Sequence, residues 1–226
     1  MVFDIEQEFD RQVAVLLSKE YPKIVGMPES EVLSFLEPLR AVVRECIADA
    51  GPEPTRFEPT HSWAPFVLVV SEKLARAEDL VPLTSLAGGT LVGIVDRNHG
   101  AEGLTPYRAL PELDVPSTEA YVLFDIERGE EFCNVRPADA LVVITDRQRT
   151  PLTIHEGIAL VTQYPGMLEK NRCFMLSGSR RGDRRVPAMW ISGKAPKLGW
   201  CWEGNPHTWL GTASAGLRGA TSPSAV

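Results

Sequence analysis

The run Phe66-Val67-Leu68-Val69-Val70 marks the point where the chain changes from helical to extended sequence. Five consecutive apolar residues in this setting are typical of a strand that is buried on both faces. Before this run, apolar residues recur at helical spacing, and after it short strand-like runs are separated by turns. Because the strands show no regular strand–helix–strand rhythm, we expect an α+β fold. Its parts are an N-terminal helical pair, a mixed and largely antiparallel sheet, and a further helix.

The helical pair is expected on the N-terminal side of this strand. Apolar residues recur every three or four positions over residues 3–20, and Pro22 ends that helix because the residue before proline resists the α region. A second apolar stripe runs from Val32 to Ile47, and Pro38 interrupts it. We divide the chain into the helical pair (1–52), an α+β domain that carries the candidate site (57–216) and a flexible tail (217–226).

The last helix has the best-marked beginning. Thr153 is a favourable N-cap and Glu156 follows three residues later, so the two residues predict a capping box. Residues 75–86 indicate a short helix, whereas residues 138–145 fit a helix or a strand. Strands are expected over residues 66–70, 90–95, 121–126, 173–178, 186–192 and 198–202.

Composition indicates an ordinary globular protein. The chain has 226 residues, 44% of them hydrophobic and 23% charged, and a formal net charge of −7, which excludes disordered and fibrous proteins. No apolar run approaches the roughly 20 residues of a membrane-spanning helix, so no membrane partner is expected. The acidic start lacks the basic region of a signal peptide, and the four cysteines are widely spaced. We therefore expect a cytoplasmic protein without a disulfide framework.

Basic residues gather in one segment. Between Lys170 and Lys197 there are eight basic residues and one acid, Asp183. This segment therefore carries +7, and the rest of the chain −14. A nucleic-acid partner is not expected, because the binding domains of such proteins are commonly basic throughout. The segment either binds an anionic small molecule or neutralises the acidic body of the same protein, and both interpretations remain open.

A glycine- and serine-rich loop, residues 177–185, is the strongest candidate for an anion site. Its glycines allow unusual backbone angles, and its arginine guanidinium groups match carboxylate and phosphate. The loop lacks the residue order of a phosphate-binding P-loop. The alternative is a hairpin turn in which Asp183 pairs with a neighbouring arginine. The residues predicted to bind the anion are Ser177, Ser179, Arg180, Arg184 and Arg185.

Four of the five tryptophans fall within 20 residues of one another. Tryptophan clusters of this kind occur in cores, at interfaces and in aromatic binding clefts. If the cluster lines a cleft, it walls the apolar part of a ligand. The residues predicted to do so, together with a neighbouring asparagine, are Trp190, Trp200, Trp202, Asn205 and Trp209.

The sequence around these tryptophans resembles a family of uncharacterised actinobacterial proteins. The similar stretches are Gly-Asp-Arg-Arg-Val-Pro-Ala-Met-Trp over residues 182–190 and Leu-Gly-Trp-Cys-Trp-Glu-Gly-Asn-Pro-His-Thr-Trp-Leu-Gly over residues 198–211. Shorter similarities include Pro-Leu-Thr over residues 151–153 and Cys-Phe over residues 173–174. The resemblance covers the C-terminal half well and the first half loosely. It implies an actinobacterial, cytoplasmic protein and no particular activity.

Cys201 is the candidate nucleophile. In an extended strand Trp200 and Trp202 share one face, whereas Cys201 and Glu203 share the other. His207 follows a turn, and if that turn folds the imidazole back over the strand end, a thiol, an imidazole and a carboxylate meet as they do in an activated cysteine. The alternatives are a buried structural cysteine and a metal or redox role.

No metal or cofactor is expected. Candidate ligands exist, but none has the C-x2-C or H-E-x-x-H spacing that marks a zinc site. Among the histidines His207 has the most suitable surroundings for a base near neutral pH. The candidate metal ligands considered are His61, His155, Cys173, Cys201 and His207.

Two functions remain open. The sequence slightly favours a binding or assembly module whose Trp/Arg-rich C-terminal surface holds a protein partner or a second copy of the chain, because tryptophan and arginine are enriched at interface hot spots. The alternative is a small enzyme that acts on an anionic small molecule. In that enzyme Cys201, His207 and Glu203 are the catalytic residues and the arginines form an anion clamp. No catalytic spacing decides whether the protein is an enzyme.

Overall fold

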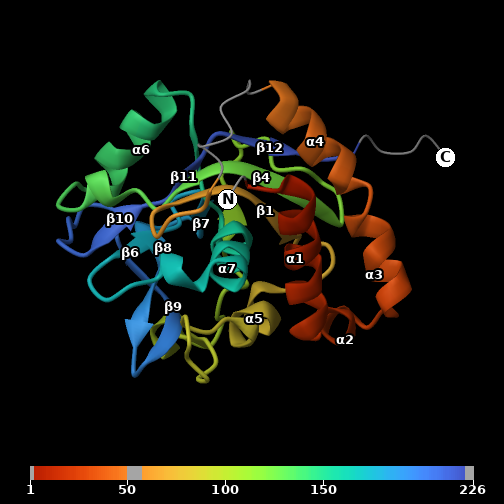
Figure 1. Ribbon diagram of the computed structural model, residues 1–226. Coiled ribbons are helices and arrows are strands. Elements are labelled where there is room, and N and C mark those ends of the chain that lie inside the picture. Colours follow the sequence, from red (N-terminus) through yellow and green to blue (C-terminus); the bar gives the residue numbers. More distant parts are fainter. Residues whose placement is uncertain (1–2, 50–57, 222–226) are drawn as a thin grey trace.

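Figure 1 shows the computed structural model of the chain, which describes residues 3–49 and 58–221. Helices and strands follow one another without a repeating unit, and the α+β class is confirmed. The central sheet is antiparallel, and its longest strands are buried along almost their whole length. Its strands are β1 (Trp63–Val70), β4 (Ala120–Glu127), β11 (Ser214–Ala215) and β5 (Thr150–Pro151), with β12 (Leu217–Gly219) also paired to β4.

A second sheet is mixed. Its inner strands pair antiparallel, whereas each outer strand runs parallel to its neighbour. In spatial order the strands are β10 (Leu210–Thr212), β6 (Cys173–Met175), β8 (Arg185–Ser192), β9 (Ala195–Trp202) and β2 (Ile94–Val95). A small third sheet pairs β3 (Arg108–Ala109) with β7 (Ser179–Arg180).

The N-terminal helices share one hydrophobic core with the sheets. Leu39 is fully buried in this core, and α4 packs against β4 and β12. Pro38 lies between α3 and α4, so the predicted interruption of the second helix is confirmed. The four helices are α1 (Ile5–Ser18), α2 (Tyr21–Val25), α3 (Glu29–Leu36) and α4 (Leu39–Asp49).

Gln12 of α1 takes the place of a neighbouring strand along the free edge of β1. Its Oε1 accepts a hydrogen bond from the backbone N–H of Leu68 at 2.9 Å, and its Nε2 donates to the carbonyl of Phe66 at 2.9 Å. A strand edge with unpaired backbone groups invites pairing with another chain. The buried amide of Gln12 satisfies these groups, so α1 covers the edge.

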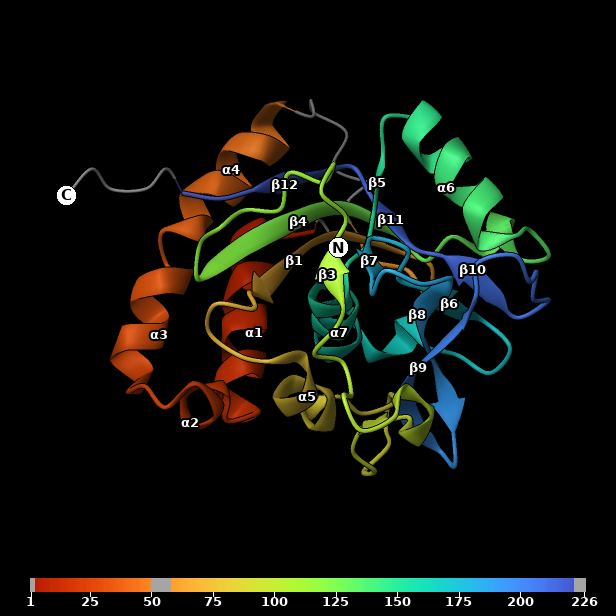
Figure 2. The ribbon, with the colours of Figure 1, turned by 180° about the vertical axis from the view of Figure 1, so that it is seen from behind.

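α7 (Ile154–Gln163) is the central helix of the molecule. Figures 1 and 2 show it beside α1, between the N-terminal helices and the second sheet. Nearly every residue of α7 is buried, and the predicted capping box of Thr153 and Glu156 is confirmed. α5 (Ala77–Leu80) lies near its N-terminal half, and α6 (Pro137–Asp146) shows that the ambiguous residues 138–145 are helical.

Several sequence predictions need correction. Pro22 does not end the first helix, which stops at Ser18, but lies in the first turn of α2. The strand expected over residues 173–178 ends at Met175. A strand was expected over residues 90–95, but pairing begins at Ile94, because Gly93 packs against the short 3-10 helix Val81–Leu83 and donates to the carbonyl of Thr84 at 2.9 Å. A flexible tail was expected from residue 217, but Leu217–Gly219 forms β12 and pairs with β4. The last tail residues (222–226) and the expected domain boundary (52–57) lie outside the described residues.

Candidate functional site

The hairpin of β8 and β9 carries most of the residues singled out in the sequence. Arg185 pairs with Trp202, and the guanidinium carbon of Arg185 lies 4.6 Å from the ring centroid of Trp200. Arg185, Trp200 and Trp202 therefore share one face of the hairpin, and Cys201 lies on the other. The extended conformation predicted for residues 198–202 is confirmed.

The thiol of Cys201 is buried. Only 8% of the residue is exposed, and its Sγ lies 3.2 Å from the Sδ of Met175. Burial raises the pKa of the thiol to about 12, although the charge of Arg180 acts in the opposite direction. A nucleophilic cysteine needs an accessible sulfur and a depressed pKa. These surroundings fit the alternative interpretation, a structural cysteine.

His207 and Glu203 have other partners. The carboxylate of Glu203 accepts a hydrogen bond from Nε of Arg184 at 2.9 Å. The ring of His207 packs against Trp209 with 5.7 Å between centroids, and burial lowers the pKa of His207. Within residues 3–49 and 58–221, no hydrogen bond joins these two side chains to each other or to Cys201. The predicted catalytic set is not assembled.

Three of the four arginines of the 177–185 loop are engaged by acids. Oδ2 of Asp183 lies 3.4 Å from Nε of Arg181 and 3.5 Å from Nε of Arg185. This geometry matches the hairpin interpretation, in which the carboxylate of the loop itself occupies the position between two guanidinium groups. Further acids come from outside the basic segment and pair with four of its residues. These pairs are Arg172 with Glu130 at 3.7 Å, Arg181 with Glu102 at 3.0 Å, Arg184 with Glu203 at 2.9 Å and Lys197 with Asp96 at 3.5 Å.

The tryptophans form two separate pairs. Trp190 meets Trp209 edge to face with centroids 6.2 Å apart, and Trp200 meets Trp202 at 4.9 Å. Trp190 covers Gly199, where a Cβ would lie 2.0 Å from the indole ring. Because Gly199 and Trp200 point to opposite faces of β9, the two pairs do not wall one cleft. Asn205 is exposed beyond the strand, in the turn that follows.

The serines of the same loop lie on the inner side. Ser177 is fully buried, and its carbonyl accepts a hydrogen bond from Nη1 of Arg180 at 2.6 Å. Burial lowers the pKa of that guanidinium. Oγ of Ser179 accepts from the backbone N–H of Ile154, the first residue of α7, at 3.0 Å. Of the residues predicted to bind an anion, Ser179 lines a cavity at the N-terminal end of α7.

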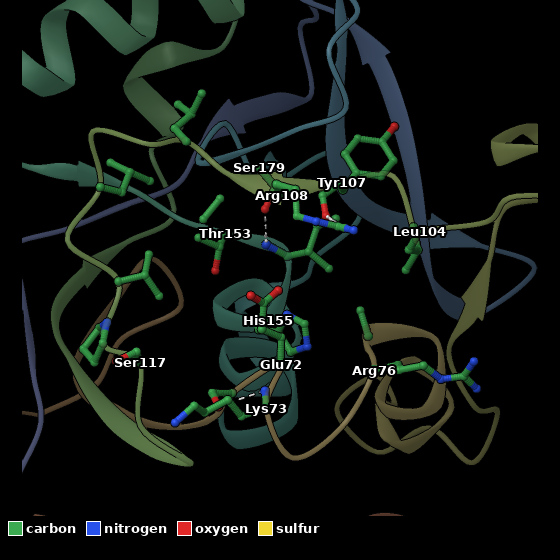
Figure 3. Close-up of a pocket in the computed structure, with 18 of the residues that line it drawn as sticks. Glu72, Lys73, Arg76, Leu104, Tyr107, Arg108, Ser117, Thr153, His155 and Ser179 are labelled. Atoms are coloured by element: carbon green, nitrogen blue, oxygen red, sulfur yellow. Dashed lines mark hydrogen bonds between the residues drawn. The ribbon is translucent and has the colours of Figure 1, made fainter. Parts of the chain in front are cut away.

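This cavity has a volume of about 770 Å³. One wall is the segment 104–117, and the other consists of residues 71–78 and the first turn of α7. Figure 3 shows His155 near the centre of the view, Arg108 and Ser179 above it, and Glu72 and Lys73 below it. The apolar part of the lining comes from Leu104, Leu110, Leu113, Val115 and Ile154.

A buried polar network lies behind the cavity. Glu156 is completely buried, and its carboxylate accepts hydrogen bonds from Tyr121 Oη at 3.0 Å and from the N–H of Thr153 at 2.7 Å. Arg218 donates to the same carboxylate through Nε at 2.5 Å and Nη2 at 2.9 Å. Burial holds the pKa of Tyr121 well above its ordinary value. Because Tyr121 and Thr153 also line the cavity, this network fixes its floor.

His155 presents a defined hydrogen-bonding group in this cavity. Its Nε2 lies 3.0 Å from the carbonyl oxygen of Ala75. A carbonyl oxygen only accepts, so Nε2 carries the proton, and in the neutral imidazole Nδ1 is left as an acceptor. Two cations of the lining have acidic partners: Lys73 lies 3.8 Å from Glu119, and Arg76 holds both carboxylate oxygens of Asp79.

Most residues of this cavity were not predicted from the sequence. One sequence feature points to it: residues 100–119 hold little regular structure beyond the two residues of β3. Irregular segments of this length are uncommon in compact domains and are often functional. The capping box marked the start of α7 correctly, but nothing local indicates that this helix end opens onto a cavity.

Within residues 3–49 and 58–221, no group of three or more His, Cys, Asp or Glu side chains is arranged to hold a metal ion. Among the helices within those ranges, none has the length and apolar character needed to cross a membrane.

The family of the chain follows from comparison with known proteins. A family model described as a family of unknown function (DUF5701) matches residues 15–221, so the chain belongs to this family. An uncharacterised family is what the C-terminal resemblance implied, whereas the actinobacterial origin stays a prediction. Searches of curated proteins and of solved structures found no match.

Proposed function

We propose that this protein, whose family carries no assigned activity, binds a small organic molecule in the cavity between α7 and the segment 104–117. The cavity itself carries the proposal. Its volume of about 770 Å³ lies within the range of small-molecule sites, which are typically apolar with a few well-placed polar groups. Here leucine and valine side chains supply the apolar surface, and the polar groups gather at the first turn of α7.

The hydrogen bonds made by two hydroxyl groups of the cavity lining favour binding over catalysis. Oγ1 of Thr153 accepts the N–H of Glu156, and Oγ of Ser179 accepts the N–H of Ile154, so both cap α7. A hydroxyl nucleophile needs a base within hydrogen-bond reach. Among the described lining residues, no hydroxyl is hydrogen-bonded to His155, whose Nε2 contacts a backbone carbonyl.

The test is a thermal-shift screen of a small-molecule library. A ligand present at 100 times its Kd stabilises the folded state by about 2.7 kcal/mol, which raises Tm by roughly 5–10 °C in a protein of this size. Ala109→Trp places an indole in the cavity from an exposed position on its wall, and Ala101→Trp is the matched control at an exposed site outside it. Hits should be lost in the first variant and kept in the second. A library without hits, or hits that Ala109→Trp leaves unchanged, would contradict the proposal.

A second candidate is the surface role predicted from the sequence. Trp202 is 44% exposed, beside Trp200 and the stacked Arg185, and this composition is enriched at interface hot spots. Trp202→Ala should abolish association with a second copy or a protein partner, as measured by analytical ultracentrifugation. The anion clamp is tested by phosphate-dependent stabilisation, which Arg184→Gln and Arg184→Lys should both remove if the guanidinium binds bidentately.

We propose that this binding takes place in the cytoplasm. The thiols of Cys133, Cys173 and Cys201 form no disulfide, and disulfides are rare in reducing compartments.

A further inference from the structure

Glu72 and Arg108 are exposed side chains of the cavity lining that form no ion pair in the described part of the chain. No ion pair or hydrogen bond engages the carboxylate of Glu72 within residues 3–49 and 58–221, and no acid pairs with Arg108 there. Arg76 is held by Asp79. Glu78 also lacks a cationic partner, but its carboxylate accepts the N–H of Leu104 at 2.7 Å. In the described lining Arg108 is therefore a cation without an acidic partner, and the carboxylate of Glu72 makes no hydrogen bond.

The guanidinium of Arg108 is held in place without being neutralised. Its Nη1 donates to the carbonyl oxygens of Thr105 at 2.5 Å and Tyr107 at 2.7 Å. Both contacts use one nitrogen, so Nε and Nη2 keep their protons for a ligand. Arg108 lies on β3, where it pairs with Arg180 of β7, and the next residue, Ala109, pairs with Ser179.

Glu72 lies on the opposite wall. Figure 3 shows Arg108 with Ser179 on one side of the view and Glu72 with Lys73 on the other. The space between them is bordered by apolar side chains, including Leu110, Val115 and Ile154. A simple anion would be repelled by Glu72, and a simple cation by Arg108. A zwitterion whose two charges are separated by an apolar body is compatible with both.

We infer that the cavity binds a short peptide with free termini and apolar side chains, with Glu72 taking the terminal ammonium and Arg108 the terminal carboxylate. This inference rests on the proposed function and names the ligand class for the same cavity. A volume of about 770 Å³ suits a ligand of drug-like size. A di- or tripeptide has that size, whereas a single amino acid does not fill the space.

The probe is Leu-Leu-Leu, titrated by calorimetry against the whole protein. N-acetyl-Leu-Leu-Leu lacks the ammonium, Leu-Leu-Leu amide lacks the carboxylate, and Ser-Ser-Ser keeps both charges without the apolar body. We expect each of the three to bind at least tenfold more weakly than Leu-Leu-Leu. Binding of all four probes with similar affinity would overturn the inference.

Variants assign the two ends of the peptide. Glu72→Gln should weaken the binding of Leu-Leu-Leu at least tenfold and leave the binding of N-acetyl-Leu-Leu-Leu unchanged. Arg108→Gln should weaken the binding of Leu-Leu-Leu at least tenfold and leave the binding of Leu-Leu-Leu amide unchanged. The matched controls are Glu45→Gln and Arg97→Gln, which are exposed and lie outside the cavity lining. If both cavity variants weaken every probe equally, or neither weakens any, the assignment of the termini is wrong.

Failure of this inference can be separated from failure of the proposed function. If Leu-Leu-Leu does not bind but library compounds bind in a manner that Ala109→Trp abolishes, the cavity is a small-molecule site for another chemical class. If neither the peptide nor any library compound binds, both proposals are wrong.

Discussion

Replacing Arg218 with methionine is expected to leave the buried carboxylate of Glu156, behind the cavity, without its cationic partner. Arg218 reaches Glu156 from β12 through two hydrogen bonds, of 2.5 and 2.9 Å. The side chain of Arg218 is 5% exposed and that of Glu156 is fully buried. Methionine fills the space of the arginine stem but leaves the carboxylate with the Tyr121 hydroxyl and the Thr153 N–H. Removal of one partner from a buried ion pair costs about 3–5 kcal/mol, and we expect a loss of unfolding free energy of that size.

The assay is urea unfolding at pH 7, with the unfolding free energy extrapolated linearly to water. Arg76→Met is the matched control, because it removes an arginine from a bidentate but exposed pair with Asp79. Exposed pairs contribute little, so its loss should be much smaller. The double variant Glu156→Gln with Arg218→Met removes the stranded charge as well. It should be more stable than Arg218→Met alone, because a neutral amide is cheaper to bury than an unpaired carboxylate.

Two results would refute this reasoning. If Arg218→Met destabilises the protein no more than Arg76→Met does, the buried pair is not the stabilising unit that its geometry indicates. If the double variant is no more stable than Arg218→Met, the cost lies in lost packing of the arginine rather than in the isolated charge of Glu156. The second result would also separate the stability of β12 from the electrostatics of the cavity floor.

Three further predictions concern other parts of the molecule. Leu39→Ala leaves a cavity in the shared core and should lower the unfolding free energy by about 2–5 kcal/mol in urea; an unchanged midpoint would mean that α4 does not belong to the cooperative unit. Because burial raises the pKa of Cys201 to about 12, an alkylating reagent at pH 8 should label this thiol only after unfolding, and rapid labelling of the folded protein would contradict this. Burial is also the main cause of the lowered pKa of His99, so the unfolded state binds the proton first as pH falls below about 6.5. The unfolding free energy should therefore decrease from pH 7 to pH 5, and less steeply in His99→Gln, as measured by urea unfolding at each pH.

Local sequence predicted those elements whose causes are local. The capping box of Thr153 and Glu156 satisfies the first N–H groups of α7 from within four residues, so the helix start could be located. Pro38 lacks a backbone N–H, and the helix is interrupted there for a reason contained in one residue. The five apolar residues that begin at Phe66 are buried as a strand for the same kind of reason.

Elements that depend on distant partners were not predictable in this way. The segment after Gly216 reads as a frayed end, because its glycine, alanine and serine residues have no strand or helix period. Yet Leu217–Gly219 pairs with β4, and Arg218 is held there by Glu156, a residue 62 positions away. Residues 90–93 show the opposite error. Their apolar character suggests a strand, but Gly93 is held against Val81 instead.

For a related reason, the structure places the candidate site at residues that are not distinctive in the sequence. The basic segment attracted attention because of its net charge, but charge along the sequence does not show which acids fold back onto it. Asp183 lies between two arginines of its own loop, and Glu102 comes from a distant segment to pair with Arg181. Charge density is thus a poor guide to a free binding group. Glu72 and Arg108 are unexceptional in the sequence, and they matter because the fold brings both to one cavity and gives neither an oppositely charged partner in the described part of the chain. The absence of a partner is a property of the folded structure, and only together with a place in the cavity lining does it distinguish Glu72 and Arg108 from charged residues that stabilise the fold or face solvent elsewhere.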